Sequence, residues 1–104
     1  MSKTSSISEL INLLVKSLRH KIGGIVNSNE IYAQKYSKDA EVLFGEAEKI
    51  CRKENWNNYD KERIKTELKK NLLIELKKCD FLDNRKFDIM DEEVIGALRS
   101  LGLD

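Results

Sequence analysis

Apolar residues recur at intervals of three or four along the first part of the chain, and this spacing predicts an amphipathic helix. The stripe consists of Ile7, Leu10, Ile11, Leu14, Val15, Leu18 and Ile22. At about 100° per residue, these positions share one side of a helix. Ser6 and Glu9 have the spacing of a capping box, so we expect the helix to begin at Ser6. Gly23 and Gly24 each weaken a helix by about 1 kcal/mol, which predicts an end near Lys21 or Ile22.

A heptad pattern marks the second predicted helix, which runs from about Asn29 to Lys53. Alanines alternate with larger side chains at intervals of three and four: Ala33, Tyr36, Ala40, Leu43, Ala47 and Ile50. This is the a/d spacing of a helix that packs along one seam. Because alanine has little bulk, the neighbouring helix should approach to the short end of the usual range of about 8–10 Å. We call Ala33, Ala40 and Ala47 the alanine seam.

The pattern leaves the neighbour of the alanine seam open. It is either another helix of the same chain or a second copy of the chain across a two-fold axis, which would make a homodimer. A break at Ser37, acting as a new N-cap, is the alternative to one continuous helix.

The third predicted helix begins near Asn58 or Asp60, after an asparagine-rich turn, and ends near Lys78. Its apolar stripe is Ile64, Leu68, Leu72, Leu76 and Cys79. Leu73 and Ile74 lie outside this stripe, so a further segment has to cover a second side of the helix.

The C-terminal segment is the candidate for that cover. Residues 80–90 predict either a short hairpin or an irregular packed loop. A last helix is expected from about Glu92 to Ser100, with Asp91 as its N-cap. Gly102 and Leu103 stand where the C′ and C″ residues of a Schellman motif would lie.

Amphipathic helices joined by short connections predict an all-α fold. We expect a small bundle of three principal antiparallel helices plus a short C-terminal helix, forming a single domain over residues 1–104. Charged residues make up 36% of the chain and hydrophobic ones 40%, which argues against both a membrane protein and wholesale disorder. Without a signal-like apolar run, we expect an intracellular, cytoplasmic protein in which Cys51 and Cys79 are reduced and buried.

The residues that usually carry catalysis or bind metals are few and scattered. His20 is the single histidine, and it lies on a different predicted helix from Cys51 and from Cys79. No glycine-rich phosphate loop or hydrolase motif occurs. We therefore expect neither an enzyme nor a bound metal or cofactor.

A protein partner is the function that the pattern favours most. Four apolar residues lie off the inner stripes of their helices: Leu13, Ile31, Val42 and Ile74. If these side chains converge in the fold, they form a patch of the kind that marks an interface. The sequence thus predicts a small adaptor, assembly or regulatory subunit that binds a protein through an apolar helical face.

The alternative is a nucleic-acid-associated subunit that uses the basic Lys61–Lys78 helix. The overall charge is only +1, yet residues 53–79 hold eight basic and five acidic side chains, and residues 80–104 hold three and seven. The lysines that would contact phosphates are Lys61, Lys65, Lys69, Lys70 and Lys77. The first three form an i, i+4 ladder of like charges. If they do not contact phosphates, they either pair with the acidic C-terminal segment or are solvated.

Overall fold

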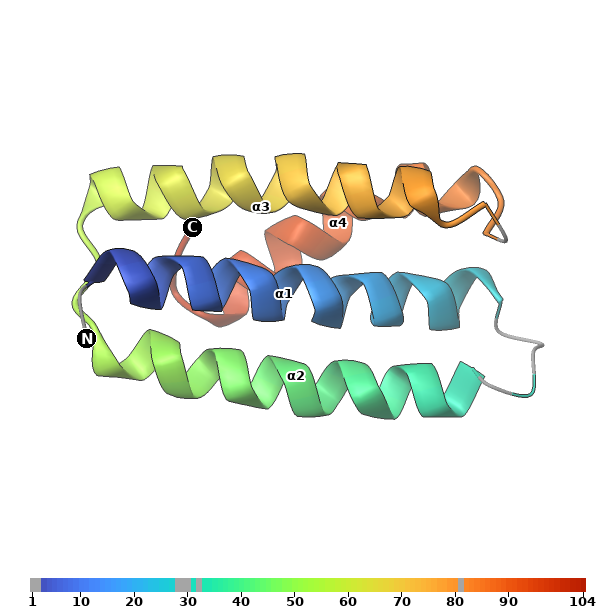
Figure 1. Cartoon of the computed structure of the whole chain (residues 1–104), viewed down its shortest axis with the longest axis horizontal. Coiled ribbons are helices and arrows are strands. Elements are labelled where there is room, and N and C mark those ends of the chain that lie inside the picture. The colour runs from blue at the N-terminus through green and yellow to red at the C-terminus, as the bar shows by residue number, and fades with distance from the viewer. Residues whose placement is uncertain (1–2, 28–30, 32, 81) are drawn as a thin grey trace.

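The computed structural model describes residues 3–27, 31, 33–80 and 82–104. This part of the chain forms four helices and no strand: α1 (Lys3–Val26), α2 (Ala33–Lys53), α3 (Asn58–Lys78) and α4 (Arg85–Ser100). Consecutive helices run in opposite directions, and α4 is the shortest, with 16 residues (Figure 1). The prediction of an all-α bundle with a shorter fourth helix is confirmed.

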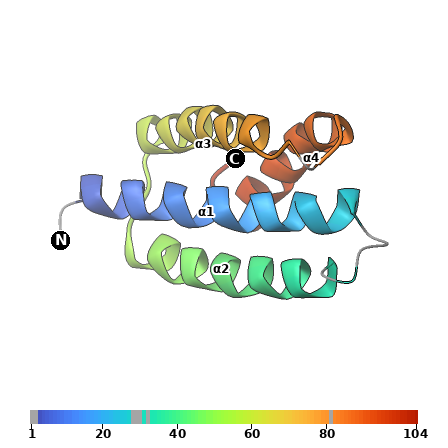
Figure 2. The same ribbon diagram turned by 45° about the vertical axis from the view of Figure 1, so that its right-hand side comes forward.

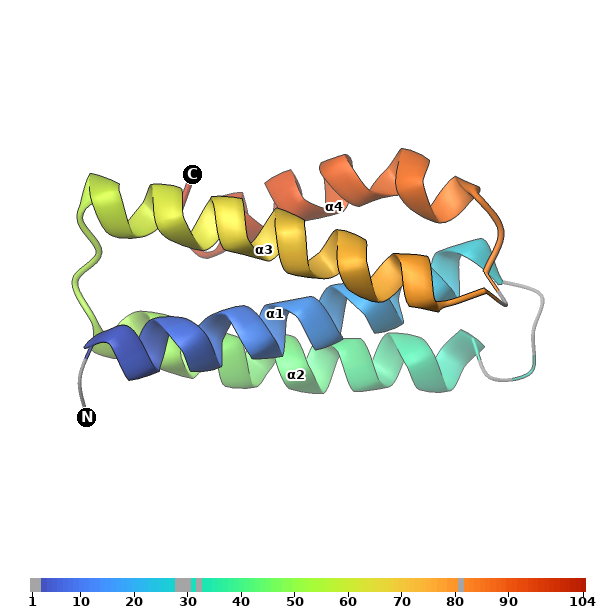
Figure 3. The same cartoon turned by 45° about the horizontal axis from the view of Figure 1, so that its top comes forward.

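The helices are arranged around α1. In two views, α1 lies between α2 and α3 (Figures 1 and 2). Helix α4 lies behind α1 and α3 in Figure 1, and a third view shows it beside α3 (Figure 3). Helices α3 and α4 pack against α1 and against each other, whereas α2 comes close to α1 alone among the described helices. Helices α2 and α3 therefore lie on opposite sides of α1. Helix α2 is antiparallel to α1, and α3 is parallel to it (Figure 1).

Buried apolar side chains from all four helices form one cluster. Its largest fully buried members are Leu10, Leu14, Ile22, Ile64, Leu68, Leu72, Leu76, Val94, Leu98 and Leu103. Those on α1 and α3 follow the predicted stripes, whereas Val94, Leu98 and Leu103 come from α4 and the turn after it. Burial stabilises the fold by about 1.5–3 kcal/mol for each large side chain. Cys51 and Cys79 are buried free thiols, as predicted, and burial raises the pKa of the Cys51 thiol.

The predicted start of the first helix is wrong. Helix α1 begins at Lys3, so Ser6 lies inside the helix and forms no capping box with Glu9. Ser6 is buried, and its hydroxyl donates a hydrogen bond to Glu54 at 3.3 Å. The ammonium of Lys3 lies 2.6 Å from the carboxylate of Asp60, which ties the first turn of α1 to the first turn of α3.

The predicted end of the first helix is also wrong, because α1 continues through Gly23 and Gly24 to Val26. A Cβ on Gly24 would lie 3.3 Å from the carbonyl oxygen of Ala33. The missing side chain therefore lets the first turn of α2 approach the backbone of α1. Packing gained in this way outweighs the low helix propensity of the two glycines.

Helices α2 and α3 follow the prediction more closely. Helix α2 is continuous through Ser37 and ends at Lys53, while the expected start at Asn29 lies outside the described residues. Helix α3 ends at Lys78 and begins at Asn58, where Asn57 and Asp60 form a reciprocal capping box. The indole nitrogen of Trp56 donates to the carbonyl of Cys51 at 2.9 Å, which caps the end of α2.

The C-terminal segment differs from the prediction at its start. Helix α4 already begins at Arg85, so Asp91 is an interior residue and not an N-cap, and the described part of residues 80–90 forms no hairpin. Instead, the Asp83 carboxylate accepts a hydrogen bond from the backbone of Arg85 at 2.8 Å. The helix stays near the core because Phe87, Ile89 and Met90 pack against it.

The predicted Schellman motif closes α4. The amide of Leu103 donates to the carbonyl of Leu98 at 2.8 Å, and the amide of Gly102 donates to Arg99 at 3.1 Å. Gly102 has a φ of +71°, which a side chain would strain. The motif turns Leu103 into the core, where it is 1% exposed. No helix in the described part of the chain is long and apolar enough to cross a membrane.

Candidate functional site

The alanine seam packs within the chain. Ala40 and Ala47 are buried on the side of α2 that faces α1. The hydroxyl of Ser17 on α1 donates to the carbonyl of Ala40 at 2.8 Å, so the two backbones lie close together. Of the two neighbours that the sequence left open, the structure shows the helix of the same chain, and α1 covers the face that a homodimer through the seam would need.

The four apolar candidates for partner binding lie apart. Leu13 is partly buried and packs against the core. Ile31, Val42 and Ile74 are 85%, 63% and 44% exposed. Val42 lies about 200° around α2 from Ala40, on the side away from α1. Ile74 lines a groove between α1 and α3. Val42 on α2 and Ile74 on α3 are separated further because these two helices lie on opposite sides of α1 (Figure 1), so the four residues do not form one patch.

The five candidate lysines are spread over two sides of α3. By helical register, Lys61, Lys65 and Lys69 flank the core stripe, whereas Lys70 and Lys77 point outward. None of them forms an ion pair with a described residue, although α4 lies alongside α3. Carboxylates of the acidic C-terminal segment pair elsewhere, for example Glu93 with Lys21 at 2.5 Å. The ladder therefore has no counter-charge among the described residues of α4.

A groove of about 540 Å³ lies between α2 and α4, over α1. We call it the α2–α4 groove. It is lined by Ser17, Leu18, Lys21, Ser37, Ala40, Glu41, Phe44, Glu48, Gly96, Ala97 and Ser100. The groove exists because α2 and α4 both pack on α1 without coming close to each other. It has an apolar floor, since Leu18, Ala40 and Ala97 are buried there.

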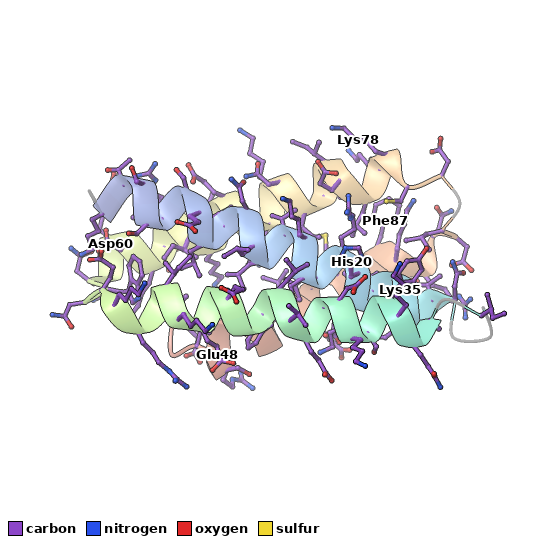
Figure 4. The ribbon with its side chains drawn as sticks, turned by 60° about the horizontal axis from the view of Figure 1, so that its bottom comes forward. His20, Lys35, Glu48, Asp60, Lys78 and Phe87 are labelled. Carbon is purple, nitrogen blue, oxygen red and sulfur yellow. The ribbon has the colours of Figure 1, made fainter. Side chains whose placement is uncertain are left out.

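The two walls of the groove differ in charge. The α2 wall carries the carboxylates of Glu41 and Glu48, and Glu48 projects from α2 beside the ribbon of α4 (Figure 4). The α4 wall consists of Gly96, Ala97 and Ser100, which are small and uncharged.

A second, smaller cleft of about 280 Å³ brings together several reactive groups. It is lined by Arg19, His20, Gly23, Tyr36, Cys79 and Leu82. The His20 ring stacks on Tyr36 with 6.0 Å between ring centroids. Burial and the nearby charge of Arg19 lower the pKa of His20, and Asp39 opposes this shift. No hydrogen bond joins His20 to Cys79, and the described residues contain no cluster of three potential metal ligands.

Lowering the pH should destabilise the folded protein, because His20 is protonated less readily in the folded than in the unfolded chain. The unfolded chain takes up a proton near the ordinary pKa of about 6.5, whereas the folded chain does so only at lower pH. The contribution of His20 to the free energy of unfolding is therefore fully present above pH 6.5 and is lost as the pH decreases toward the pKa of the folded state. We expect His20→Gln to flatten this part of the curve, measured as the urea midpoint at several pH values between 7.5 and 5. An equal slope in both proteins would contradict the assignment.

The sequence offered little signal for the α2–α4 groove. Glu41 and Glu48 are seven residues apart and so share one side of α2, but which helix lies opposite them depends on how three helices pack. Gly96 lies inside the helix predicted from Glu92 to Ser100, where no turn is expected. A glycine at such a position was the one local sign of an unusual helix surface. The function has to be argued from this geometry, because no protein-family model, curated protein or solved structure matches the chain.

Proposed function

We propose that the protein is a helical interaction module, an adaptor or regulatory subunit, that binds one helix of a partner protein in the α2–α4 groove. The observation that carries the proposal is the separation of α2 and α4 on the common surface of α1. We infer that a further helix packs at the position this leaves open on the bundle. Recognition of an amphipathic helix by an apolar groove is a recurring way in which helical proteins bind partners.

The dimensions and residues of the groove support this occupant. Its α2 wall extends from Ser37 to Glu48, which at about 1.5 Å per residue spans about 16 Å, or three helical turns. Small residues on both sides, including Ser37, Gly96 and Ala97, let a helix approach closely. The buried floor offers apolar contacts to one face of that helix.

A photo-crosslinking amino acid placed at Ser37 or Ser100 tests the proposal in cells that express the protein. Both positions are exposed and line the groove, so we expect specific adducts with a partner from both. The control is Thr66, an exposed position on α3 away from the groove. Adducts from Thr66 alone would place the interface on α3 and contradict the proposal.

A groove-filling variant tests whether the captured partner uses this site. Ser100→Trp adds bulk at an exposed position, so we expect it to weaken binding of that partner at least tenfold while the thermal midpoint stays the same. Thr66→Trp should leave both unchanged. Binding of nucleic acid that weakens steeply with salt and requires Lys65 and Lys69 would instead favour the nucleic-acid alternative.

A further inference from the structure

We infer that the helix accepted by the α2–α4 groove carries two basic residues seven positions apart on the flank that faces α2. This inference rests on the proposed function and specifies the chemistry of the partner. It is carried by the unequal charge of the two groove walls, and three features of the described residues support it.

The first feature is the spacing of the carboxylates. Glu41 and Glu48 both line the groove and lie seven residues apart on α2, which places them about 10.5 Å apart along the helix axis. A helix lying along α2 presents residues at i and i+7 with the same spacing on one side. Two lysines or arginines at these positions would each meet one carboxylate.

The second feature is that these carboxylates form no strong ion pair with a described residue of the chain. Glu41 is exposed and forms no ion pair with a described residue. Glu48 lies 3.2 Å from Arg52, whose side chain is 80% exposed. An exposed pair of this kind contributes little to stability, so Arg52 is readily exchanged for a cation of the partner.

The third feature is that the other residues lining the groove carry no uncompensated charge. Gly96, Ala97 and Ser100 are neutral, and the ammonium of Lys21 is paired with Glu93 at 2.5 Å. Among the lining residues, negative charge is thus confined to the α2 side. Charges confined to one wall select the orientation and register of a bound helix, because a reversed helix would leave its cations beside the neutral wall.

Two synthetic amphipathic peptides of 18 residues serve as probes. They share one apolar stripe and differ only at two flanking positions, i and i+7, which are lysine in one peptide and glutamate in the other. Binding is measured by fluorescence anisotropy, and the site is mapped by amide chemical shifts of the folded protein. We expect the lysine peptide to bind at least tenfold more tightly and to shift resonances of the groove residues on α2 and α4.

Charge variants of α2 provide the matched control. Glu41→Lys combined with Glu48→Lys should reverse the preference for the lysine peptide. Glu46→Lys makes the same kind of change on the opposite flank of α2, where Glu46 pairs with exposed Lys49 at 3.3 Å, and should leave the preference unchanged. Circular dichroism verifies that each variant is folded, since all three glutamates are at least partly exposed.

The outcomes separate the inference from the proposed function. If both peptides bind in the groove with equal affinity, or if Glu46→Lys acts as strongly as the double variant, the charge inference is wrong and the groove remains a helix-binding site. If neither peptide shifts resonances of the groove residues, the proposed function fails as well.

Discussion

Deletion of residues 80–104 is expected to abolish cooperative unfolding. The deleted segment contributes Val94, Leu98 and Leu103, each at most 1% exposed, to the core. At about 1.5–3 kcal/mol for each large buried side chain, their loss is comparable to a total stability of about 5–15 kcal/mol. The deletion also uncovers the sides of α1 and α3 on which α4 packs.

Urea unfolding, followed by circular dichroism, and size-exclusion chromatography measure this effect. We expect a broad transition or aggregation in place of a single sharp one. Leu98→Ala is the milder companion variant, with an expected loss of about 2–5 kcal/mol and a transition that stays cooperative. A truncated chain that remains monomeric with an unchanged midpoint would mean that α4 is an independent tail.

Ala47→Leu should destabilise the protein by about 1–3 kcal/mol through overpacking against α1. Ala47 is fully buried and borders none of the grooves described above, so a larger side chain has no space to enter. For a domain of this size, each kcal/mol lowers the thermal midpoint by about 4–8 °C. Ala40→Leu should cost less, because Ala40 lines the α2–α4 groove and its new side chain turns into that space.

The dependence of this loss on protein concentration distinguishes contacts within the chain from contacts between copies. Because the seam packs on α1 of the same chain, we expect the same loss for Ala47→Leu at protein concentrations that differ tenfold. Lys38→Leu, at an exposed position of α2, is the control and should change the midpoint little, since lysine and leucine have similar helix propensities. A loss that grows on dilution would instead indicate a dimer.

The periodic patterns predicted much of the fold because they extend over many residues. The stripe from Ile7 to Ile22 and the stripe from Ile64 to Cys79 are buried as expected. Repetition makes such patterns robust, since one misplaced residue hardly changes which side is apolar. The Schellman motif at Gly102 was also predictable, because its geometry depends on a few neighbouring residues.

Single-residue signals at helix ends were less reliable. Ser6, the pair Gly23–Gly24 and Asp91 each matched a local rule for a helix boundary, and all lie inside helices. Capping and propensity are worth about 1 kcal/mol each, which is less than the packing gained by extending an apolar stripe along a neighbour. At Gly24, the close approach of Ala33 on α2 supplies that gain.

The order of apolar and polar residues by itself determined that this chain forms helices, which side of each is buried, and that α2 carries a seam of small residues. Only the tertiary structure decided that the seam packs on α1, that α2 and α3 lie on opposite sides of it, and that a groove separates α2 from α4. The physical reason is that the two kinds of information act over different distances along the chain. Periodicity acts within one helix, whereas the choice of neighbour depends on how side chains from several helices fill a common space.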